Sequence, residues 1–141
     1  MSGETASGSL AAELLVVSLA EVDGVDEATL RRLSGRSLFD AACCGSDGFR
    51  RHGDRLRGLP RQTGQSSTLG GGGGFGAEVA CALNALAIAC GDHDDVHWET
   101  LVHLGGVVWP AVLAAGEAVD ATVNAAYRAA ALGHEVGTRL A

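Results

Sequence analysis

Apolar and polar positions along the first third of the chain predict two helices. Residues 10–20, LAAELLVVSLA, form an apolar run of helix-forming residues that is three turns long and too short to cross a bilayer. After an Asp-Gly turn, Asp26 is a candidate N-cap for a second helix. That helix has an approximate stripe of leucine and alanine over residues 26–44, and a break near Gly35 is expected because glycine weakens helices.

The second half of the chain predicts further helices. Residues 77–90, AEVACALNALAIAC, are apolar nearly all round, which indicates a buried helix ending at Gly91. Residues 107–119 predict the next helix, with Pro110 in its first turn, and residues 120–131 predict an alanine-rich helix capped by its aspartate. Because strand patterns are weak throughout, the predicted fold class is all-α, a helical bundle of about five helices.

Composition and charge narrow the functional classes. Hydrophobic residues make up 47% of the chain and aromatic residues only 4%, which suits a small, closely packed helical core. The formal net charge is −7, and all ten basic residues are arginine, so we expect no nucleic-acid partner. No run is apolar enough for a membrane span, and the first nine residues lack the basic start of a secretory signal. We therefore expect a cytoplasmic protein with no membrane partner.

Two stretches of unusual composition lie between the predicted helices. Residues 50–61 hold five arginines and one aspartate, which favours a solvated loop, with a docking site for an anionic substrate or partner as the alternative. Residues 66–76, SSTLGGGGGFG, contain six glycines but no lysine, so a phosphate-binding loop is excluded and a flexible connector is expected. The four cysteines, at positions 43, 44, 81 and 90, lack CxxC spacing and are interpreted as buried, reduced thiols.

Ionisable side chains crowd together in one segment between two apolar helices. Crowded carboxylates raise one another's pKa, and an imidazole beside them can exchange a proton near neutral pH. A solvated loop with capping aspartates is one alternative, and a metal site built on His93 and His97 of a helix is a weaker one. The ionisable residues of the segment are Asp92, His93, Asp94, Asp95, His97, Glu99 and His103.

The ordered motifs of this segment and its flanks resemble those of the MmgE/PrpD family. The resemblance extends over about residues 26–141, and the ordered series is more specific than any one motif. The motifs are Leu38-Phe39-Asp40, Asn84-Ala85-Leu86, Asp92 to His97 (DHDDVH), His103 to Gly106 (HLGG), Pro110-Ala111 with Glu117, and Gly133 to Val136 (GHEV) with Arg139.

The resemblance implies a fold and a chemistry. The family includes 2-methylcitrate dehydratase, cis-aconitate decarboxylase and iminodisuccinate epimerase, which share a large helical domain and a smaller α/β lid, usually form dimers and need no metal. This chain is then expected to hold an N-terminal helix and turn at 1–25 and part of the helical domain at 26–141, without the lid. The two parts would form a single structural unit.

The resemblance also assigns site residues. His103 would be the general acid/base, and Asp92 would orient a catalytic group or the substrate. The substrate pocket would further include Asp95, Val96, His97 and Ala89, with no metal and no cofactor. Many family members have threonine and histidine where this sequence has Val96 and Ala89.

The absence of lysine from the sequence bears on function, because the family's pocket lysines hold substrate carboxylates. We therefore expect one subunit of a split lyase or isomerase that dehydrates, decarboxylates or epimerises a small carboxylate. A second chain would supply the remaining helices, the lid and the cationic groups, in a homo- or hetero-oligomer. The alternatives are a non-catalytic helical scaffold subunit, and the same scaffold reused as an isomerase or cyclase for a less polar substrate.

Overall fold

A computed structural model describes residues 10–56 and 63–141, and the prediction of an all-α fold is confirmed for these residues. None of the described helices combines the length and the apolar character that crossing a membrane requires. The elements are α1 (Leu10–Gly24), α2 (Glu27–Leu56), β1 (Thr63–Ser66), α3 (Ala77–Ala89), α4 (Gly105–Ala118) and α5 (Val123–Leu140).

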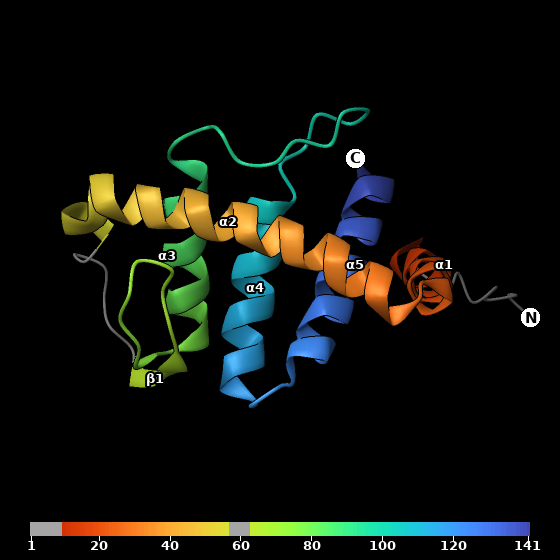
Figure 1. Ribbon diagram of the computed structural model, residues 1–141, viewed down its shortest axis with the longest axis horizontal. Helices are drawn as coiled ribbons and strands as arrows, with labels where there is room; N and C mark the ends of the chain where they lie inside the picture. Colours follow the sequence, from red (N-terminus) through yellow and green to blue (C-terminus); the bar gives the residue numbers. More distant parts are fainter. Residues whose placement is uncertain (1–9, 57–62) are drawn as a thin grey trace, which may run out of the picture.

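The helices form two layers. Helices α3, α4 and α5 lie side by side, and α2 runs across one side of this row, as Figure 1 shows. Helix α1 packs against α5 near the start of α2. The core between the layers is made of small and medium side chains around one fully buried tryptophan. Its members are Ala41, Cys44, Ile88, Val108, Trp109 and Ala130.

Helix α2 is longer and more regular than the sequence predicted. It continues through Gly35 without a break. The adjacent Ser34 faces α5 and donates a hydrogen bond to the Tyr127 carbonyl at 3.2 Å. It also continues to Leu56, so the prediction of a loop from residue 50 is wrong as far as the structure describes this stretch. Residues 57–61 of that predicted loop lie outside the described residues.

Side-chain caps fix the starts of two helices. The prediction of Asp26 as an N-cap is confirmed, since its carboxylate accepts the backbone N–H of Thr29 at 2.9 Å. For α5 the cap is Thr122 instead of Asp120, whose φ of 53° places it in a turn before the helix. Helix α5 then runs beyond residue 131 to the end of the chain, where its second half packs against α4 and the segment before it.

The glycine-rich segment 66–76 is an ordered loop and not the flexible connector that its composition favoured. Asn84, fully buried on α3, accepts the backbone N–H of Leu69 at 2.8 Å and donates to the carbonyl of Ser67 at 3.2 Å. One buried amide therefore satisfies a donor and an acceptor of the loop backbone, and it fixes the loop against α3.

Candidate functional site

The segment between α3 and α4 carries the ionisable cluster. It projects from the end of the helix row, as the loop at the top of Figure 1 shows. Its tip is a tight turn in which the N–H of His97 donates to the Val102 carbonyl and the N–H of Leu101 donates to the His97 carbonyl. Leu101 has a φ of 57°, and the side chain of Trp98 is 85% exposed. The tip is therefore a compact turn that presents apolar side chains to its surroundings.

At the base of this segment Asp94 pairs with His103. Asp94 Oδ1 lies 3.2 Å from His103 Nδ1, and the aspartate side chain is 4% exposed whereas the histidine side chain is 41% exposed. The buried carboxylate faces Nδ1 of the ring and so favours one orientation of the imidazole. Proton exchange with a bound molecule would then take place at the other ring nitrogen, Nε2.

Asp95, the next residue, pairs with a histidine from the last helix. Its Oδ1 accepts the backbone N–H of Gly105 at 2.8 Å, and its Oδ2 lies 3.8 Å from His134 Nε2. Burial opposes the charge on both groups, but their mutual attraction outweighs it, aided by the Gly105 N–H on one side and the Ala130 carbonyl on the other. The pKa of Asp95 is consequently lowered and the pKa of His134 is raised.

His134 also connects this segment to the buried core. Its Nδ1 lies 2.9 Å from the Ala130 carbonyl and its Nε2 lies 3.4 Å from Ser37 Oγ. Ser37 in turn accepts the indole N–H of the buried Trp109 at 2.9 Å. A chain of contacts therefore runs from Asp95 through His134 to Ser37 and Trp109, and it ties the segment to the core.

Both carboxylates lie at the N-terminal end of α4. Besides the Gly105 N–H on Asp95, a Cβ placed on Gly106 would lie 2.9 Å from Asp94 Oδ2. The positive end of a helix dipole stabilises anions, and the hydrogen bond from the Gly105 N–H helps to lower the pKa of Asp95. Because the helix starts at Gly105, Pro110 lies in its second turn and not in the first turn that the sequence predicted.

Comparison with known proteins identifies the fold that carries this cluster. A family model described as the MmgE/PrpD N-terminal domain matches residues 17–141. The chain belongs to the MmgE/PrpD family. No curated protein and no solved structure matches the chain. The family resemblance seen in the sequence is thus confirmed, and the ionisable cluster lies inside the matched MmgE/PrpD domain.

The two residues predicted to be catalytic in this MmgE/PrpD domain, Asp92 and His103, lie in different surroundings. Asp92 is exposed in a left-handed turn, with a φ of 50° and its N–H bonded to the carbonyl of Ala89. Among the described residues, no hydrogen bond or ion pair joins Asp92 to His103, and Asp94 faces the ring instead. Sequence reasoning counted Asp94 in the cluster but had no means of deciding which aspartate points at the histidine.

The predicted substrate-lining residues are spread along the segment. Ala89 is the last residue of α3 and is exposed, and Val96 is 49% exposed. His97 is half-buried, with its Nδ1 2.9 Å from Thr100 Oγ1, and this pair shapes the turn at the tip. Of this set Asp95 is tied to the helices beneath, through His134 and the N–H of Gly105. The structure therefore brings Asp94, Asp95, His103 and His134 to the base of the segment.

His134 was missed as an acid–base residue. The sequence placed it only in the GHEV motif that resembles the family, far along the chain from the aspartates. No spacing rule links a residue on the last helix to a loop before α4, so only the packing of α5 reveals the pair.

The structure also bears on the metal site and the buried thiols that the sequence suggested. His93 and His97 lie in non-helical backbone, so they do not share a helix face as the metal hypothesis required. Among the described residues, no group of three or more potential ligands is arranged to hold a metal ion. Of the four free thiols, Cys43 and Cys90 are exposed, contrary to expectation. Burial and the nearby carboxylates raise the pKa of Cys44 to about 11, so this thiol stays protonated.

Proposed function

We propose that this chain contributes the acid–base groups of a lyase or isomerase that acts on a carbon beside a carboxylate. The observation that carries the proposal is the pair formed by buried Asp94 and half-exposed His103. Removing a proton beside a carboxylate, or losing a group there, passes through an enolate-like state that needs a proton acceptor or donor. His103 would exchange that proton at Nε2, and Asp94 would hold the ring. The reaction class follows from membership of the MmgE/PrpD family together with this pair.

The cationic groups of the site would come from a second polypeptide. Asp94 and Asp95 are anionic, and the nearby His134 is already paired with Asp95. Substrate carboxylates at this place would be repelled unless outside cations compensated for the aspartates. Apolar side chains on the same segment support coverage by a partner, because Trp98 is 85% exposed and Leu101 is 70% exposed. The expected assembly is therefore a hetero-oligomer whose partner completes the pocket.

Reconstitution with a partner tests the proposal. The chain is co-expressed with the protein encoded by the neighbouring reading frame, and the purified complex is incubated in D₂O with 2-methylcitrate, cis-aconitate and other small carboxylates. Proton NMR then follows deuterium exchange and product formation beside the carboxylate. His103→Gln should lower turnover by about 10²- to 10⁴-fold, the usual contribution of a general acid or base. His52→Gln, on the far part of α2, is the matched control and should leave turnover unchanged.

The outcomes separate the candidate functions. Unchanged turnover for His103→Gln in an intact complex would leave this chain a scaffold. Failure of the chains to co-purify, with no turnover of any substrate, would refute the split enzyme. A second candidate is an enzyme for a less polar acid, which the apolar Ala89 and Val96 favour. Turnover of apolar monocarboxylates in preference to dicarboxylates would support that candidate.

A further inference from the structure

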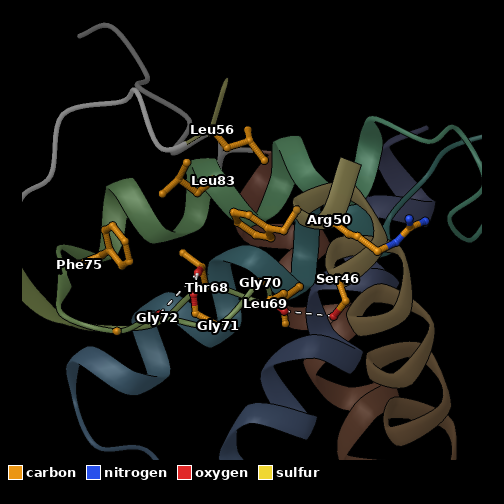
Figure 2. A pocket seen from close by; sticks show the side chains of 12 residues that line it. Ser46, Arg50, Leu56, Thr68, Leu69, Gly70, Gly71, Gly72, Phe75 and Leu83 are labelled. Carbon is orange, nitrogen blue, oxygen red and sulfur yellow. Dashed lines mark hydrogen bonds between the residues drawn. The ribbon is translucent and has the colours of Figure 1, made fainter. Parts of the chain in front are cut away.

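A cavity of about 400 Å³ lies between the C-terminal half of α2, helix α3 and the glycine-rich loop. Figure 2 shows it from close by, with the loop along one side and the two helices around it. Its volume falls in the range of small-molecule sites, about 300–1,000 Å³. It shares no lining residue with the Asp94–His103 site. The proposed function therefore leaves this cavity without a role.

The walls of the cavity are fixed by specific contacts. A Cβ placed on Gly70 would lie 2.5 Å from Phe49 Cβ and nearer still to the ring atom Cγ, so the loop backbone packs directly on this phenylalanine. Ser46 Oγ donates to the Leu69 carbonyl at 3.1 Å, while the Leu69 N–H is held by Asn84. The loop is thus tied to both α2 and α3. A cavity formed in advance avoids the entropy cost of ordering its walls when a ligand binds.

The lining combines apolar side chains with polar atoms, and its charged side chain lies at one end. Phe49, Leu83 and Phe75 supply apolar surface, whereas Ser46 and Arg50 lie one turn apart on the same face of α2. In Figure 2 Phe75 and Arg50 are at opposite ends of the group of side chains. A ligand that matches this division has an apolar body and a polar group at one end.

The charge of the side chains around Arg50 indicates whether the polar group of the ligand is an anion, a cation or neutral. Asp47 forms ion pairs with both Arg50 and Arg51, so the three side chains together carry one surplus positive charge. The Arg50 side chain is 70% exposed and keeps N–H groups for a further acceptor. A guanidinium binds a carboxylate through two parallel hydrogen bonds, which favours an anion over a neutral polar group.

We propose that this cavity binds a small organic acid with a single carboxylate and an apolar body, such as an aromatic or short-chain acid. The carboxylate pairs with Arg50 beside Ser46, and the hydrocarbon body lies against Phe49 and Leu83. The proposal concerns a second site and does not depend on the acid–base function of His103.

Phenylacetate is the probe, and phenylacetamide is its neutral counterpart of nearly equal shape. Each is titrated into the full chain while amide resonances are followed by NMR. Phenylacetate should shift the backbone amides of residues 70–73, and Arg50→Gln should weaken its binding about ten-fold, the effect of losing one charged hydrogen-bonded pair. Phenylacetamide binding should be the same with and without Arg50. Arg36→Gln is the matched control, because Arg36 is an exposed arginine of the same helix that does not line the cavity.

A variant that fills the cavity gives a second measurement. Gly73 lines the cavity, has open space around an added Cβ and does not have a positive φ, so Gly73→Phe should fold and block both probes. Gly73→Ala should bind both as the wild type does. Absence of any shift at residues 70–73 with millimolar phenylacetate would overturn the proposal. So would equal weakening by Arg50→Gln and Arg36→Gln, or binding that survives Gly73→Phe in a folded protein.

Discussion

Gly48 is the point at which α2 and α3 approach most directly, and replacing it tests the central packing of the fold. An added Cβ would lie 2.7 Å from the carbonyl carbon of Ala87 and nearer still to the carbonyl oxygen, whereas ordinary contact begins at 3.4 Å. The obstacle is backbone on a regular helix and cannot rotate away as a side chain would. Gly48→Ala therefore forces the two helices apart.

The expected change in the free energy of unfolding for Gly48→Ala follows from two opposing contributions. Overpacking a well-packed contact costs about 1–3 kcal/mol, and a rigid backbone obstacle places this site at the upper end. Alanine recovers up to about 1 kcal/mol of helix propensity relative to glycine. The net loss in the free energy of unfolding should be about 2 kcal/mol. Gly35→Ala on the same helix is the control, because its Cβ would lie 3.7 Å from the Tyr127 hydroxyl and should stabilise by about 0.5–1 kcal/mol.

Urea unfolding followed by far-ultraviolet circular dichroism measures both variants. The urea concentrations at the midpoint of unfolding should move in opposite directions from the wild type. The slope of the free energy of unfolding against urea concentration should stay unchanged. If Gly48→Ala proved as stable as the wild type, the close crossing of α2 and α3 described above would be wrong. If Gly35→Ala were also destabilised, glycine would be needed at that position for a reason that the packing does not show.

Two further predictions concern the buried polar groups. Asn84→Ala removes both hydrogen bonds to the backbone of the glycine-rich loop and should lower the free energy of unfolding by about 1–3 kcal/mol. Hydrogen exchange at the Leu69 amide should become faster, and an unchanged exchange rate would contradict the anchoring role. The raised pKa of His134 means that its pairing with Asp95 stabilises the fold fully below the ordinary histidine pKa, and that this stabilisation is lost as pH rises through the raised value. The lowered pKa of Asp95 means that its contribution is lost as pH falls through the lowered value. The difference in stability between the wild type and His134→Gln should therefore be largest at about pH 5 and smaller at about pH 9. A difference in denaturation midpoints that does not change with pH would argue against the pair.

The sequence by itself determined the family, the all-α class and the segment that carries the ionisable side chains. These depend on local properties: apolar runs of helical length, the capping carboxylate of Asp26, and an ordered series of motifs from residue 26 onward. It also bounded the chemistry, because crowded aspartates and histidines between apolar helices are visible without any structure.

Tertiary structure decided which of those side chains meet. Asp94 and not Asp92 faces His103, because the chain turns through a left-handed residue at position 92 and only then reaches α4. His134 pairs with Asp95 because α5 packs against α4. Asn84 orders the glycine-rich loop, whose composition alone predicts a flexible segment. In each case the deciding contact joins residues whose approach depends on how the chain turns and how the helices pack, so no local pattern of the sequence contains it.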